Sequence, residues 1–234
     1  MPMLSVLSAG AAKGLVQALQ PEFERESGIS LQCMFGAVGA MLERLDAGAA
    51  CDVIILTRTM IDALAREERV DASRVTDLGW VHTGVAVMAR APAQPVTDVP
   101  SLLSLLQPAS AIYLPDPERA TAGIHALRVL KALQLPNLDT RLRAYPNGAA
   151  AMAALAQRGD PQAVGITQVS EILYTPGVQL LGVLPAPHGL ATLYSAAAMR
   201  GAARADAAAQ LLKRIGAPER ARGREQAGFA AVAS

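Results

Sequence analysis

A short stretch near the N-terminus carries residue types that could bind an anion. Leu4 to Leu7 is typical of a buried strand, and Ser8-Ala9-Gly10 then turns the chain into a helix. A helix that begins at a strand end leaves backbone N–H groups unpaired, and its dipole favours negative charge there. The Ser8 hydroxyl adds a donor, and Gly10 lets a ligand approach the backbone. Most junctions of this kind bind nothing, so the hypothesis needs support from elsewhere in the chain.

Three further segments repeat this pattern of strand, small-residue turn and helix. They are Phe35–Met41, Pro115–Ile124 and Pro146–Met152. In open α/β sheets, ligands bind at the carboxyl ends of strands. We therefore expect four helix N-termini to face a common cleft and to supply N–H donors to a small anion.

Few side chains could move a proton. Lys13, His82 and Tyr194 are the candidates, with Asp116 and Glu118 beside them. Each also has a purely structural interpretation. His82 fits a surface or hinge position, Lys13 fits a solvated helix start, and the two acids, flanked by prolines, fit caps of the next helix. His125 and His188 are expected to be structural or exposed.

The sequence lacks the motifs of several other kinds of site. No Gly-Lys-Ser/Thr follows Gly36-Ala37-Val38-Gly39, so this is no P-loop, and there is no Gly-x-Ser-x-Gly turn. No His/Cys cluster has metal-ligand spacing, and we expect no metal and no cofactor. Cys33 and Cys51 are expected on strands as buried hydrophobes. The net charge of +1 and the lack of a long apolar run predict neither nucleic-acid binding nor membrane insertion.

The elements that must position these residues alternate between strand and helix. Strands are expected at 4–7, 29–35, 52–56, 80–89, 111–114, 142–145, 163–167, 178–184 and 192–199. Helices are expected at 11–24, from 38, from 59 with Thr59 and Asp62 spaced like a capping box, and at 102–106, from 121, 149–157, 203–215 and from 218. This order favours an α/β fold with mixed, mostly parallel sheets flanked by helices. The pattern runs through twice, which predicts two lobes, and the long strand at 80–89 could cross between them.

The order of motifs resembles the periplasmic-binding-protein type II fold, and within it the molybdate-binding proteins of ABC importers. The resemblance covers nearly the whole chain. It is carried by Ser8-Ala9-Gly10-Ala11, Phe35–Leu45 with Asp46-Ala47-Gly48-Ala49, Cys51–Ile54, Pro115–Glu118 with Ala122-Gly123-Ile124, Gly165-Ile166-Thr167 and Pro176-Gly177-Val178.

The resemblance implies two α/β lobes with the ligand between them. Lobe one would comprise residues 1–82 and 188–234, and lobe two residues 83–187. Ser8 matches a hydroxyl on the oxyanion, Ala122 and Thr167 match contacts from the second lobe, and Tyr194 matches a phenol that closes over the ligand. With the loops above, the predicted ligand-binding residues are Ser8, Ala9, Gly10, Gly36, Ala37, Val38, Gly39, Thr121, Ala122, Gly123, Asn147, Gly148, Thr167, Gln168 and Tyr194.

One departure from the family concerns the second loop, where relatives carry hydroxyls and this chain has Gly36–Ala40. Losing a hydroxyl on a buried anion costs about 1.5–3 kcal/mol. Backbone N–H groups could compensate, so the expected ligand is molybdate or tungstate, or else a small polycarboxylate. A binding protein is the favoured interpretation and an ABC permease its expected partner. The alternatives are an isomerase of a small tricarboxylic acid, resembling aconitate isomerase, and an effector-sensing domain.

The N-terminus shows no basic region and no cleavage site before the first strand. The sequence as written therefore predicts a cytoplasmic protein, or a periplasmic one whose signal peptide has been removed.

Overall fold

The computed structural model describes residues 2–92 and 94–232. The chain divides into two compact units, one formed by Met1–Val81 with Thr192–Ser234 and the other by His82–Ala191. The outer ends of the predicted first lobe, Met1 and Ser234, lie outside the described residues. So does Ala93, in the loop expected at 91–100.

The sheet of the first unit has the strand order β2-β1-β3-β9, with β4 following β9. β1 (Met3–Ala9) lies parallel to both β2 (Ser30–Gly36) and β3 (Val53–Thr57), and β9 (Ala191–Met199) is antiparallel to β3. Val53 to Leu56 are fully buried, as expected for an apolar strand that is covered on both faces.

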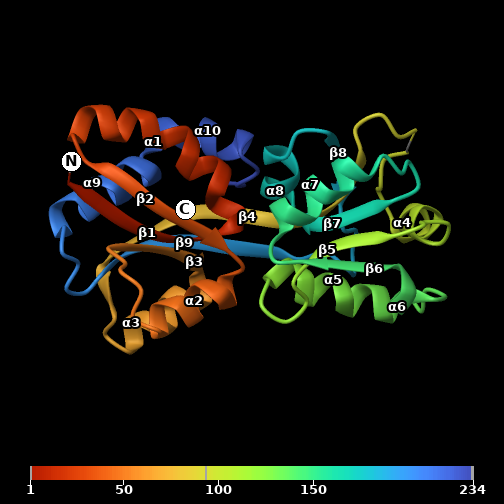
Figure 1. The fold of residues 1–234 in the computed structure, drawn as a ribbon, viewed down its shortest axis with the longest axis horizontal. Helices are drawn as coiled ribbons and strands as arrows, with labels where there is room; N and C mark the ends of the chain where they lie inside the picture. Colours follow the sequence, from red (N-terminus) through yellow and green to blue (C-terminus); the bar gives the residue numbers. More distant parts are fainter. Residues whose placement is uncertain (1, 93, 233–234) are drawn as a thin grey trace. The chain divides into compact units, whose positions relative to one another are not determined.

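Helices cover both faces of this sheet (Figure 1). One face carries α1 (Lys13–Ser27), which continues from η1 (Gly10–Ala12), and α9 (Ala205–Gly216). The other face carries α2 (Val38–Asp46) and α3 (Arg58–Arg66). The chain ends with η2 (Pro218–Arg220) and α10 (Ala221–Gln226).

The second unit has the strand order β4-β7-β5-β6. β5 (Ile112–Pro115) is parallel to β6 (Leu142–Tyr145) and to β7 (Val164–Gln168), whereas β4 (Val70–Met88) is antiparallel to β7 and β8 (Val178–Val183). The β4 strand begins in the first unit and ends in the second.

Two apolar clusters hold the helices of this unit to its sheet. Val85, Ile166 and Leu114 pack with α4 (Val99–Leu106) and α5 (Thr121–Ala132). On the other face, Tyr113 and Ala86 pack with α7 (Gly148–Arg158) and α8 (Val169–Tyr174). The short α6 (Leu138–Arg141) precedes β6.

The structure confirms the predicted α/β class with mixed sheets flanked by helices. Four details differ. The long strand begins at Val70, ten residues before its predicted start, and the short helices α6 and α8 were not predicted. Thr57 caps α3, where its hydroxyl accepts from the Met60 N–H, so Thr59 is not the cap. Cys51 precedes β3 instead of lying on a strand.

Candidate functional site

Two helix N-termini lie side by side in the first unit. β1 and β2 pair in register up to their last residues, with Ser8 opposite Phe35 and Ala9 opposite Gly36. η1 begins directly after Ala9, and α2 begins after Ala37. The predicted contacts Ser8, Ala9, Gly10 and the loop 36–39 are therefore brought together at one edge of the sheet.

These two helix starts are open to an anion. Among the described residues, no side chain caps η1 or α2, and neither first turn contains an acid. Their first N–H groups have no partner inside the helix, and the dipole favours negative charge at that end. The neighbouring α3 differs, because the Thr57 hydroxyl occupies its N-terminus.

Ser8 is fully buried at this edge. Its hydroxyl donates to the carbonyl oxygen of Ala9 at 3.0 Å, a bond to its own neighbour. A rotation about χ1 would turn the same donor toward a bound anion, so the hydroxyl can serve a ligand without breaking a bond between elements.

Tyr194 lies on β9, directly opposite Thr57. The residue is 2% exposed, and its ring meets the Phe229 ring edge to face, with the centroids 6.3 Å apart. The next residue, Ser195, donates to Asp77 at 2.6 Å, and Asp77 also accepts from Arg58 at 2.9 Å. Tyr194 thus belongs to the same sheet as the paired helix starts and is fixed by packing.

The other two proton-transfer candidates lie in different units. Lys13 is the half-buried first residue of α1, and His82 is exposed on β4 in the second unit.

In the second unit, the N-terminus of α5 is open. α5 begins after Ala120, and within the described chain no side chain caps it and its first turn contains no acid. Gly123 lets this end approach β5 closely, because a Cβ there would overlap the carbonyl oxygens of Pro115 and Asp116. The predicted contacts Thr121, Ala122 and Gly123 form this first turn.

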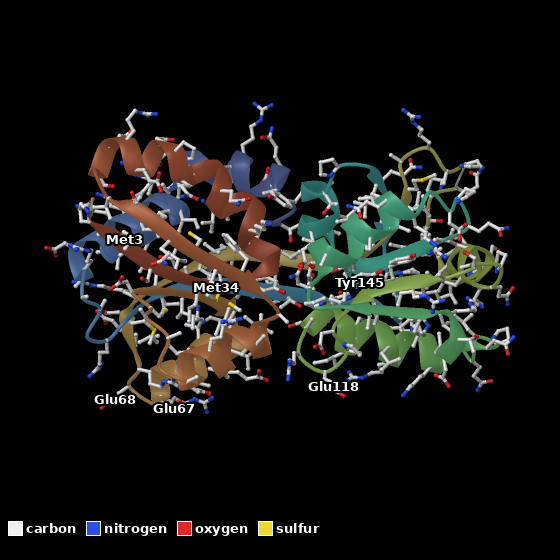
Figure 2. All side chains as sticks on the ribbon, in the orientation of Figure 1. Met3, Met34, Glu67, Glu68, Glu118 and Tyr145 are labelled. Atoms are coloured by element: carbon white, nitrogen blue, oxygen red, sulfur yellow. The ribbon has the colours of Figure 1, made fainter. Side chains whose placement is uncertain are left out.

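The acids before α5 do not cap it. Asp116 accepts from the backbone N–H groups of Glu118 and Arg119, at 2.8 and 3.0 Å, and so fixes the turn ahead of the helix. Glu118 lies exposed in that turn (Figure 2). The sequence analysis predicted that these two acids cap the next helix. Asp116 instead stabilises the turn that precedes α5.

The predicted contacts around α7 have partners within the protein. Asn147 caps α7 by accepting from the Ala150 N–H at 2.9 Å. The Gly148 N–H donates to Glu171 Oε1 at 3.1 Å, and the Thr167 hydroxyl donates to Glu171 Oε2 at 2.6 Å. Burial raises the pKa of Glu171, while the hydrogen bonds from Thr167 and from the N–H groups of Ala149, Gly148 and Gln168 oppose that shift.

A buried hydroxyl that the sequence analysis missed lies beside Gln168. Thr83 pairs with Gln168 at the end of the β4–β7 ladder, and both side chains are buried. The Thr83 hydroxyl has no hydrogen-bond partner among the described residues. An unpartnered buried hydroxyl suits a ligand or a water. Nothing in the sequence around Thr83 distinguishes it from a core strand residue.

The remaining histidines and cysteines have structural positions. His125 Nε2 lies 2.8 Å from the His188 carbonyl oxygen, which ties α5 to the loop that follows β8. The cysteines are both free and partly buried, and burial raises the pKa of Cys33 to about 11 and that of Cys51 to about 12. In the described part of the chain, no group of His, Cys, Asp and Glu side chains could hold a metal ion.

Comparison with known proteins identifies the family. Residues 4–230 match the family described as bacterial extracellular solute-binding protein, and the chain belongs to that family. Aconitate isomerase from Pseudomonas sp. is 25% identical over 234 residues, covering 98% of this chain and 88% of the relative. The molybdate-binding protein ModA of Escherichia coli is 23% identical over 201 residues, covering 85% of this chain and 77% of the relative.

Solved structures support the fold. The periplasmic molybdate-binding protein of Azotobacter vinelandii superposes with a TM-score of 0.80 at 16% identity, and the match covers 98% of this chain and 100% of that one. The predicted resemblance to molybdate-binding-type solute-binding proteins is confirmed.

Proposed function

We propose that this solute-binding protein binds a small oxyanion or small carboxylate. The observation that carries the proposal is a contrast between helices. η1 with α1, α2 and α5 start without a side-chain cap or an acid in the described residues, whereas α3, α4 and α7 are capped by Thr57, Asp98 and Asn147. Three of the four helix starts that the sequence marked as anion contacts are therefore open, and the fourth, that of α7, is capped. The short α10 also starts without a cap or an acid in the described residues, but the sequence did not mark it.

Each unit, taken by itself, would offer donors to a ligand. The first unit would supply the Ser8 hydroxyl and the N–H groups of Gly10 and the loop 38–39. The second would supply the N–H groups of 121–123, with Gln168 and Thr83 beside them. Hydrogen bonds to a charged group contribute about 1.5–3 kcal/mol each, so a few of them suffice for micromolar binding.

Two relatives support an anionic ligand by their names, one a molybdate-binding protein and one an aconitate isomerase. Isothermal titration calorimetry with molybdate, tungstate, sulfate, citrate and the aconitates tests the proposal. We expect saturable heat with at least one of these anions, and none with glucose. Saturable binding of glucose without any anion response would refute it.

A second candidate function is isomerisation of a small tricarboxylic acid on the same scaffold. The specific observation is the match to aconitate isomerase, which covers 98% of this chain. Lys13, His82 or Tyr194 would move the proton, since each could act as an acid or a base. Incubation with cis- and trans-aconitate, followed by NMR, tests this candidate. Interconversion by the wild type that disappears when Lys13, His82 or Tyr194 is substituted supports this candidate. No interconversion by the wild type rules it out.

Family membership also bears on partner and compartment. We propose an ABC permease as the partner and a location outside the cytoplasm, which is the second of the two compartments that the sequence allowed. None of the helices that the structure describes is long and apolar enough to cross a membrane. Fractionation of cells that express the full-length gene product tests the location, and a purely cytoplasmic pool would contradict it.

A further inference from the structure

Glu171 is a buried acid at the N-terminus of α7. It lies in the first turn of α8, its side chain is buried, and the residue is 5% exposed. One carboxylate oxygen accepts from the Gly148 N–H, and the other accepts from the Thr167 hydroxyl. The Ala149 and Gln168 N–H groups also donate to this carboxylate.

This arrangement leaves α7 without free donors at its start. The Gly148 and Ala149 N–H groups are taken by Glu171, and the Ala150 N–H is taken by Asn147. α5 begins one strand away, at the end of β5, and has no such buried acid within the described residues. The two neighbouring helix starts of this unit therefore differ in what they can offer a ligand.

The local sequence is fitted to this carboxylate. A Cβ at residue 148 would overlap both Glu171 Oε2 and Thr167 Oγ1, so only glycine leaves room for it. Thr167 projects from β7 toward the same face as α7 and α8, because Gly84, its partner in the ladder, faces Val169 and Ile172 there. Thr167 on β7 and Gly148 at the start of α7 thus both contact the buried Glu171 carboxylate.

We propose that Glu171 is a specificity-determining residue that disfavours doubly charged oxyanions. This inference rests on the proposed anion binding. Pro115 at the end of β5 pairs with Tyr145 at the end of β6, and adjacent strands lie about 4.8 Å apart. α5 and α7 therefore start beside neighbouring strand ends, on opposite faces of the sheet. Repulsion grows with the charge of the ligand, and it is strong where the surroundings are poorly solvated. Glu171 also withholds from the ligand the Thr167 hydroxyl and the Gly148 N–H.

The test compares wild type with Glu171→Gln by calorimetry at a series of increasing pH values, because burial raises the pKa of Glu171 and only the ionised carboxyl repels an anion. The amide keeps the shape and can still accept from the Gly148 N–H. Its NH₂ can donate to Thr167, which frees the Thr167 O–H for a ligand. We expect molybdate and sulfate to bind at least tenfold more tightly to the variant, with a smaller gain for singly charged acetate.

Two controls separate charge from structure. Asp139→Asn removes one exposed charge from α6, which precedes β6 and so lies at the end of that strand opposite to α7, and should leave the dissociation constants unchanged. Thr167→Val removes the hydroxyl but keeps the Glu171 charge, and should bring no gain. If Glu171→Gln does not fold by circular dichroism, Glu171→Ala is used with the same expectation.

The outcomes also distinguish this inference from the proposed function. Wild type that binds no anion, together with a Glu171 variant that binds molybdate or sulfate, supports the role of Glu171. Wild type that binds anions, with a folded Glu171 variant that binds molybdate and sulfate no better, overturns the inference and leaves the proposed function standing. Failure of both proteins to bind overturns both.

Discussion

Ala9 and Gly36, the last residues of β1 and β2, are direct partners in a parallel ladder. Each is followed almost at once by a helical turn that no side chain caps among the described residues. Because adjacent strands lie about 4.8 Å apart, the two helix starts can point donors at one small anion. This pairing is the structural basis of the proposed site in the first unit.

An acid placed at the start of α2 should block binding without harming the fold. Gly39→Asp puts a carboxylate at the second position of α2, where the dipole stabilises it by about 0.3–1 kcal/mol. It also occupies the N–H groups proposed for the ligand, so we expect the affinity for the bound anion to fall at least tenfold. Calorimetry and urea unfolding measure the two effects separately.

The matched control is Thr59→Asp, at the second position of α3, whose N-terminus Thr57 already caps. It changes the net charge equally and should leave anion affinity unaltered. Equal losses of affinity in both variants would mean that net charge, and not the start of α2, controls binding.

Removing the Ser8 hydroxyl should weaken the ligand with little effect on stability. Ser8→Ala deletes a donor that, in the described part of the chain, donates to the carbonyl oxygen of Ala9. If that hydroxyl meets a charged group, affinity should fall by roughly tenfold to a hundredfold. Ser110→Ala, which removes an exposed hydroxyl bonded to Asp160, is the control. An unchanged dissociation constant in Ser8→Ala would remove Ser8 from the site.

Gly123→Ala should destabilise the second unit. The new Cβ would overlap two carbonyl oxygens of the backbone, which cannot move as a flexible side chain could. Overpacking of this kind costs about 1–3 kcal/mol. Gly223→Ala in α10 meets nothing within 4 Å and should be neutral or slightly stabilising. Differential scanning calorimetry compares the variants, and equal melting temperatures would contradict the close approach of α5 to β5.

Glu171 should give the stability of the protein a distinctive pH dependence. Burial raises its pKa in the folded state above the ordinary value of 4.5. The folded state then binds the proton more tightly than the unfolded state, so this contribution is fully present below 4.5 and is lost as the pH rises through the raised pKa.

Glu171→Gln does not titrate and should lack this fall. Urea unfolding at pH values from acidic to mildly alkaline measures the free energy of unfolding of both proteins. We expect the difference, variant minus wild type, to grow with pH. A difference that stays constant with pH would show that the folded state does not perturb the Glu171 carboxyl.

The fold could be predicted because its signals are local. The apolar run before Leu56, the alternation around Cys33 and the repeated turns into helices each specify one element. The extra ten residues of β4 could not be seen, because the segment from Val70 is polar and is held in the sheet by pairing.

The open helix starts were also visible in the sequence, since Ala37 and Ala120 cannot cap a helix. Glu171 was missed. Its spacing from Gln168 is that of a capping box, which could have indicated α8. Its bond to Gly148, however, joins residues 23 positions apart and depends on the packing of α7 against α8. The same carboxylate explains why Gly148 and Thr167, predicted as ligand contacts, each have an internal partner.

The melting temperature of the purified chain with and without anions tests the central claim most directly. A ligand that binds only the folded state adds about 2.7 kcal/mol of stability at one hundred times its dissociation constant. In a protein of this size, that corresponds to a rise of about 5–10 °C. We predict such a concentration-dependent rise with at least one of molybdate, sulfate, citrate and the aconitates, and no rise with glucose at equal concentration. A rise with glucose and with none of the anions would contradict the account.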